Sequence, residues 1–181
     1  MCPKLETPRL TLQGHTPSDF DDLAAMWADP LVVRHITGKA STPQESWSRL
    51  LRNRGLWSVL GYGYWCVRET RSGRYVGDVG FADFRRDSGP SVRGVPEAGW
   101  VLARWAHGRG FAHEAVSAIL SWLDGSTEHE RVVCFIVAGN APSIRIAEKS
   151  GFVASGIVRL NDEAVSLWER KRAPPGSGRR G

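Results

Sequence analysis

Eight residues from Trp105 to Ala112 have the composition of a loop that binds a phosphate group. They read Trp-Ala-His-Gly-Arg-Gly-Phe-Ala and join an apolar run at 97–102, typical of a strand, to an amphipathic run at 111–123, typical of a helix. Small residues at 108, 110 and 112 let a ligand approach the backbone closely. Because the first N–H groups of a helix have no partner within the helix, and the helix dipole is positive there, this loop predicts an anion site.

A second group of polar residues follows the apolar run 132–137, which is typical of a fully buried strand. Asn140 can cap the helix expected at 142–150, and Ser143 lies in the first turn of that helix. Both side chains are therefore expected to face the gap between the strands at 97–102 and 132–137.

The glycine-rich loop differs from the two common nucleotide motifs. It lacks the Gly-Lys-Ser/Thr end of a Walker loop, and it lacks the third glycine of a dinucleotide fingerprint. Taken alone, such a turn is equally well explained as a tight connection between a strand and a helix. Its pairing with Asn140 and Ser143 favours a ligand.

Length and composition indicate one globular domain. The chain has 181 residues, of which 41% are hydrophobic and 24% charged. Its three cysteines, an odd number without paired spacing, favour reduced thiols over disulfides or a zinc site and predict a cytoplasmic protein without a metal. No apolar run approaches the roughly 18 residues that span a membrane, and no secretory signal is expected.

The basic character of the chain, with a pI of about 9.5, resides in its last residues. Residues 170–181 contain five of the 24 Lys and Arg and no acid, which leaves 19 bases against 19 acids in the rest. We therefore expect a domain at 1–169 and a basic, Pro/Gly-rich disordered tail at 170–181. Nucleic-acid binding by the folded domain is not expected, because no basic patch supports it.

The remaining patterns predict the elements that position the two motifs. Thr16-Pro17-Ser18-Asp19 and Thr42-Pro43-Gln44-Glu45 each have the residues of a helix start. In the second of these helices, Trp47, Leu50 and Leu51 are expected on the buried face. Strands are expected at 9–13, 64–68, 75–84, 156–160 and 164–168, with Gly151 as a left-handed helix end and Phe152 packing after it. The order β-α-α-β-β-β-α-β-α-β-β predicts an α/β domain with a mixed sheet.

With these motifs the chain resembles the GNAT superfamily of acetyl-CoA-dependent N-acetyltransferases. Within that superfamily it is most similar to the RimJ/RimL-like branch, which includes ribosomal-protein alanine acetyltransferases. The resemblance rests on His107-Gly108-Arg109-Gly110-Phe111-Ala112 with Glu114-Ala115, on Asn140-x-x-Ser143, and on Glu148-Lys149-Ser150-Gly151-Phe152, with further matches at 6–10, 76–81 and 97–100. It implies a single-domain GNAT-like fold. In that fold a mixed, mostly antiparallel sheet is flanked by helices, and two central parallel strands splay around the CoA arm.

The resemblance also implies how acetyl-CoA is bound. Its diphosphate is expected on the backbone amides at 109–113 and its pantetheine arm along the strand backbone at 101–103, where one N–H polarises the thioester carbonyl. The expected cofactor-binding residues are Val101, Leu102, Ala103, His107, Gly108, Arg109, Gly110, Phe111, Ala112, His113, Asn140 and Ser143.

Two residues are the candidates for catalysis. Glu97 is expected to take a proton from the amine, directly or through water, and Ser143 to protonate the leaving thiolate. Each has a structural alternative, because Glu97 at a strand start can pair with an arginine and Ser143 can serve as a helix cap.

The function implied by this resemblance is acetyl transfer from acetyl-CoA to a primary amine by direct attack in a ternary complex. The acceptor is a peptide N-terminus or a small molecule, and the protein is a monomer or a homodimer. The alternative is a catalytically inactive CoA-binding protein of the same fold with a regulatory or assembly role.

Overall fold

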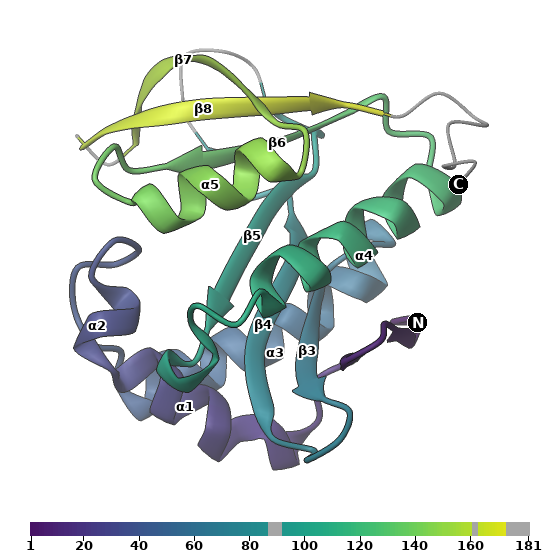
Figure 1. Cartoon of the computed structure of the whole chain (residues 1–181), viewed down its shortest axis with the longest axis vertical. Coiled ribbons are helices and arrows are strands. Elements are labelled where there is room, and N and C mark those ends of the chain that lie inside the picture. The colour runs from purple at the N-terminus through teal and green to yellow at the C-terminus, as the bar shows by residue number, and fades with distance from the viewer. Residues whose placement is uncertain (87–91, 161–162, 173–181) are drawn as a thin grey trace.

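An eight-stranded mixed sheet forms the centre of the computed structural model, which describes residues 1–86, 92–160 and 163–172 (Figure 1). The strand order is β1-β2-β3-β4-β5-β6-β8-β7. The strands are β1 Leu5–Glu6, β2 Leu10–Gln13, β3 Tyr64–Glu69, β4 Tyr75–Ala82, β5 Glu97–Leu102, β6 Arg131–Ile136, β7 Val153–Leu160 and β8 Glu163–Lys171. The helices are α1 Phe20–Ala28, α2 Pro30–Val33, α3 Pro43–Leu60, α4 Phe111–Ser126 and α5 Ala141–Lys149, with 3-10 turns at Pro17–Asp19 and Arg104–Ala106.

Strands β5 and β6 separate in the middle of this sheet. Neighbouring strands are antiparallel except β5 and β6, which are parallel and in register at the pair Glu97 and Val133. There the Val133 amide donates to the Pro96 carbonyl at 3.0 Å. From this pair onward β5 and β6 separate, and β5 continues to Leu102 without a further paired residue of β6. This arrangement confirms the expected fold class, with central parallel strands that splay.

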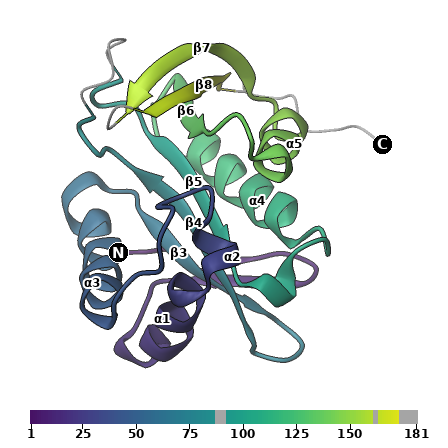
Figure 2. The same cartoon turned by 90° about the vertical axis from the view of Figure 1, so that its left-hand side faces the viewer.

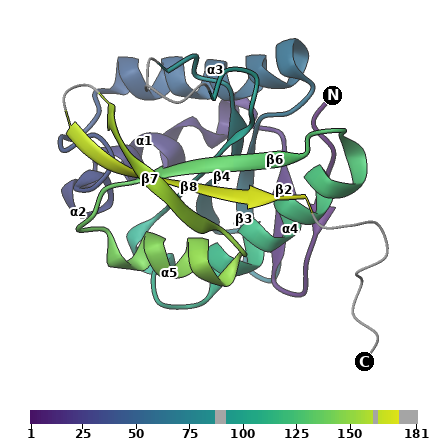
Figure 3. The same cartoon turned by 90° about the horizontal axis from the view of Figure 1, so that it is seen from above.

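Helices cover both faces of the sheet. Helices α1 and α3 lie on one face, and α4 and α5 lie on the other (Figures 2 and 3). The largest core cluster includes Phe111, Val116 and Ile119 of α4 together with side chains of β2, β3 and β4. Because α4 is fixed by this buried stripe, the loop before it is fixed as well.

Both expected helix starts are confirmed, but one expected buried face is wrong. Thr42 and Glu45 form a capping box, in which the Thr42 hydroxyl accepts from the Glu45 amide at 3.2 Å. Trp47 is 40% exposed and Leu51 52% exposed, whereas Leu50 is buried as expected. The buried face of α3 consists of Ser46, Leu50, Asn53 and Trp57. Two of these four buried residues, Ser46 and Asn53, are polar, whereas apolar residues are expected on a buried helix face.

The last strand runs past the expected end of the domain at residue 169. Strand β8 continues to Lys171, and Arg170 forms an ion pair with Asp124 of α4 at 2.6 Å. Two residues of the expected tail at 170–181 therefore belong to the sheet, and residues 173–181 lie outside the described residues. Gly151 is left-handed as expected, with φ of +83°. Within the described ranges, no helix is both long enough and apolar enough to cross a membrane.

Candidate active site

The loop at 107–110 turns the chain into α4 with its amides exposed. Gly108 and Gly110 both have left-handed backbones, with φ of +72° and +80°, which residues with a side chain rarely adopt. The Glu114 amide makes the first helical bond, to the Gly110 carbonyl at 3.1 Å. Among the described residues, none accepts a hydrogen bond from the amides of 108–113. Successive free amides beside a helix N-terminus are a built site for an anion.

Arg9 fastens this loop to the first strands. Its guanidinium donates to both the Glu114 carboxylate, at 2.6 Å, and the Arg109 carbonyl, at 2.9 Å. The Thr7 hydroxyl also donates to Glu114, at 2.6 Å. Burial raises the pKa of Glu114, but the hydrogen bonds from Thr7 and Arg9 outweigh it, so this pKa lies below its usual value. Glu114 is thus an anion compensated by Arg9.

A first cavity of about 570 Å³ extends from this loop along β5 and α5. We call it the cradle cavity. Of the expected cofactor-binding residues, those that line it are Val101, Leu102, His107, Gly108, Gly110, Ala112, His113, Asn140 and Ser143. Arg34, Arg145 and Lys149 line it too, and no described lining residue is acidic. The cradle cavity therefore suits a polyanionic ligand such as CoA.

Two expected ligand residues turn away from the cradle cavity. The Arg109 guanidinium lies over the Trp105 ring, 5.2 Å from its centroid, and 3.8 Å from the Glu69 carboxylate. The Phe111 side chain is buried in the core. For Phe111 only the backbone amide is available to a ligand, and the Arg109 side chain does not line this cavity.

The expectation for the backbone at 101–103 is corrected by the pairing of β5. The Ala103 amide donates to the Val76 carbonyl at 2.8 Å, so it is engaged inside the sheet. Backbone groups of successive residues in a strand point to opposite edges, so those of Val101, two residues before Ala103, also face β4. The groups of Trp100 and Leu102 face the gap beside β6. Of these, the Leu102 carbonyl accepts from the His107 ring at 2.9 Å.

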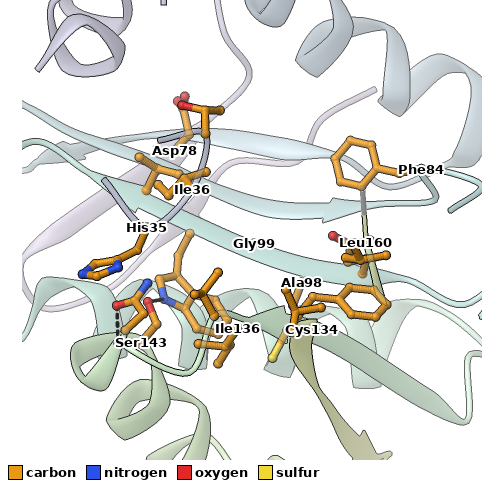
Figure 4. A pocket seen from close by; sticks show the side chains of 18 of the residues that line it. His35, Ile36, Asp78, Phe84, Ala98, Gly99, Cys134, Ile136, Ser143 and Leu160 are labelled. Carbon is orange, nitrogen blue, oxygen red and sulfur yellow. Dashed lines mark hydrogen bonds between the residues drawn. The ribbon is translucent and has the colours of Figure 1, made fainter. Parts of the chain in front are cut away.

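A second cavity, of about 780 Å³, lies between β5, α3 and the segment after α2. We call it the acceptor cavity. Figure 4 shows Ser143 near one end of it and Phe84 and Leu160 near the other. Trp100, Val101, Asn140 and Ser143 line both cavities. A group held at the inner end of one cavity is therefore in reach of the other.

Asn140 and Ser143 meet at this junction, as the sequence predicts. The Asn140 side chain caps α5 by accepting from the Ser143 amide at 3.3 Å. The Ser143 hydroxyl oxygen accepts from the Trp100 indole at 3.3 Å. Because the indole can only donate, the hydroxyl hydrogen of Ser143 stays available to a ligand.

Glu97 lines the acceptor cavity but is already paired. Arg86 donates to both carboxylate oxygens of Glu97, at 2.7 and 2.8 Å. Burial raises the pKa of Glu97, Arg86 lowers it, and the balance leaves it above the usual value. The arginine pairing considered as an alternative is therefore present, and it leaves a carboxylate of raised basicity at the cavity wall.

Tyr64 is a residue of the acceptor cavity that the sequence does not single out. An added Cβ on Gly99 would lie 2.1 Å from the Tyr64 hydroxyl, so this hydroxyl lies directly over the bare backbone of β5. Burial raises the pKa of Tyr64, which keeps the phenol neutral. In the described part of the chain, no group of three or more His, Cys, Asp or Glu side chains could hold a metal ion.

Comparisons with known proteins agree with this geometry. Residues 9–153 match the family described as "Acetyltransferase (GNAT) domain". The uncharacterized protein YkkB of Bacillus subtilis is 29% identical over 171 residues, which cover 93% of this chain and 95% of YkkB. A putative GnaT-family acetyltransferase from Bordetella pertussis superposes with a TM-score of 0.81 at 34% identity, covering 93% and 99% of the two chains. RimL, a ribosomal L7/L12 α-N-protein acetyltransferase in complex with coenzyme A, shares the fold with a TM-score of 0.75 at 15% identity, covering 93% and 98%.

Proposed function

The chain belongs to the GNAT acetyltransferase family, and on this premise we propose that it transfers the acetyl group of acetyl-CoA to a primary amine in the acceptor cavity. Acetyl-CoA supplies an acetyl group activated as a thioester. The observation that carries the proposal is the junction of the two cavities at Trp100, Asn140 and Ser143. A thioester held in the cradle cavity and an amine held in the acceptor cavity can meet there.

The backbone of the cradle is proposed to hold the diphosphate of acetyl-CoA. The amides of 108–113 would donate to its oxygens, and the cations Arg34, Arg145 and Lys149 would offset its charge. The backbone groups of Trp100 and the Leu102 amide, which face the gap beside β6, would align the pantetheine arm. A main-chain N–H at this edge of β5 is suited to polarise the thioester carbonyl.

Proton transfer is assigned to two residues. Ser143, whose hydroxyl hydrogen is free, would protonate the leaving thiolate. Glu97 would accept a proton from the amine through one of its remaining lone pairs or through water. A free α-amine, with a reference pKa of roughly 7.7–8 against about 10.4 for lysine, needs less help from such a base.

Release of free CoA thiol from acetyl-CoA in the presence of an amine panel tests the proposal. The panel should contain peptides with free N-termini, amino acids, polyamines and aminoglycosides. We expect release that depends on one class of amine and falls at least tenfold in Ser143→Ala, with CoA affinity unchanged. CoA binding without turnover of any amine would instead support the inactive CoA-binding protein.

A further inference from the structure

Two arginines on α3 face the acceptor cavity without a carboxylate partner. Arg49 and Arg52 are one helical turn apart, and both line the cavity. Among the described residues, neither forms an ion pair within 4.0 Å, although eleven other pairs of the chain do. The guanidinium of Arg52 lies over the Phe84 ring, 5.4 Å from its centroid.

Arg49 is held firmly in place, although no carboxylate of the described residues lies within ion-pair distance of it. Its guanidinium lies 3.6 Å from the centroid of the Trp27 ring, and one terminal nitrogen donates to the Ser41 hydroxyl at 3.3 Å. Its Nε is buried and has no acceptor. Burial lowers the pKa of Arg49 and the positive charge of Arg52 lowers it further; the charges of Asp78 and Glu45 offset part of this, and the pKa stays below its usual value. A bound anion would satisfy this nitrogen and relieve the repulsion between the two arginines.

The acids that line the same cavity are committed elsewhere or lie apart from α3. Glu97 is bound by Arg86 through both oxygens. The Oδ1 atom of Asp78 is bound by the His15 ring at 2.6 Å and by the Tyr75 hydroxyl at 2.7 Å. Its Oδ2 atom is buried without a partner among the described residues, but the carboxylate lies beyond ion-pair distance of Arg49.

Glu163 is the third acid of this lining and belongs to β8, across the cavity from α3. A third cation, Arg34, also lines the cavity, and its Nε donates to the His35 ring at 3.2 Å. The α3 side of the cavity is therefore positive.

We infer that the amine acceptor also carries an anionic oxygen group, a carboxylate or a phosphate, which binds to Arg49 and Arg52. This inference rests on the proposed function and adds the class of acceptor to it. With the anionic group on α3, the amine would extend along β5 toward the junction at Trp100 and Ser143. Its nitrogen forms a bond to the acetyl carbon as the C–S bond breaks, and the proton lost by the amine balances the one gained by the thiolate. Polycations such as polyamines and aminoglycosides would be repelled by the same arginines.

The experiment compares amines in pairs that differ in the anionic group alone. Suitable pairs are an amino acid with its carboxamide, and phosphoethanolamine with ethanolamine, each assayed by CoA release. Rates are expressed per unprotonated amine, because a neighbouring anion raises the pKa of the amine. We expect kcat/KM to be at least tenfold higher for the anionic member of one pair, and that pair identifies carboxylate or phosphate as the group.

Substitutions on α3 then locate the effect. Arg52→Gln, at an exposed position, and Arg49→Gln should each raise KM for the anionic amine severalfold while kcat changes little. Arg52→Glu should reduce the preference further or reverse it. Arg54→Gln is the matched control, because Arg54 belongs to the same helix but lies near Gly14 and Cys2, outside the cavity.

The outcomes separate this inference from the proposed function. Acetylation of neutral or cationic amines as efficiently as anionic ones would overturn the inference and leave the acetyltransferase activity in place. A preference for anionic amines that survives in both Arg49→Gln and Arg52→Gln would overturn the assigned subsite. No CoA release with any amine would overturn the proposed function, and the inference with it.

Discussion

Replacing Arg9 by glutamine would leave the Glu114 carboxylate without its cation beside the amides proposed to bind the diphosphate. In the structure, Arg9 compensates Glu114 and also holds the Arg109 carbonyl of the loop. Glu114 is the fourth residue of α4, so its carboxylate lies about one helical turn, roughly 5.4 Å, from the first free amides. We expect Arg9→Gln to weaken CoA binding.

The size of the effect follows from this spacing. A carboxylate about 8 Å from a phosphate charge costs roughly 2 kcal/mol at an effective dielectric constant of about 20, and salt reduces this to about 1 kcal/mol. Between them, these values correspond to about a 5- to 30-fold increase in the Kd for CoA. Isothermal titration at two salt concentrations measures it, and the loss should be larger at low salt.

A double-mutant cycle isolates the charge effect of this pair. Glu114→Gln alone removes the anion and should bind CoA at least as tightly as the wild type. The double variant should return to within about threefold of the wild-type Kd, since no unpaired carboxylate is left. Lys4→Gln, which breaks the exposed pair with Glu6, is the control and should change nothing. A double variant as weak as Arg9→Gln would refute charge compensation and point to the contact with the Arg109 carbonyl.

Three further substitutions test other parts of the account. Gly110→Ala should lower the free energy of unfolding by about 1–2 kcal/mol, because Gly110 has a left-handed backbone. The control Gly125→Ala, in open space within α4, should raise it by roughly 0.5–1 kcal/mol. Denaturant titration measures the free energy of unfolding of both variants. Arg86→Gln removes the contacts that lower the pKa of Glu97, so the acid limb of kcat/KM should move to higher pH, and an unmoved limb would exclude Glu97 as the base. Asn140→Ala removes the cap of α5 and should cost about 1 kcal/mol of stability, which thermal unfolding would show as a lower Tm.

Local signals in the sequence were sufficient to place most elements. The two capping boxes and the glycine pair at 108 and 110 act within a few residues, so α1, α3 and the turn into α4 were correctly predicted. Helix α2 was missed because a single turn, Pro30–Val33, is too short to show a periodic pattern. The buried face of α3 was wrongly predicted because Asn53 is buried at the cavity, where hydrophobicity is a poor guide.

The parts of the site that were missed depend on contacts between distant segments. The sequence offers an arginine as a partner of Glu97 but does not identify it as Arg86, and it does not indicate that Arg9 meets Glu114 across more than a hundred residues. Nothing in the local sequence of Tyr64 marks it as a cavity residue; only the register that lays it over Gly99 does. The edge of β5 that Trp100 and Leu102 share likewise follows from strand register, which residue spacing alone left undetermined.

A crystal structure of the protein with CoA is the most direct test of the cradle and the junction together. The account predicts diphosphate oxygens at about 2.7–3.2 Å from amides of residues 108–113, with the sulfur beside Ser143 where the two cavities meet. A diphosphate bound elsewhere, or a sulfur that does not reach the junction with the acceptor cavity, would contradict it.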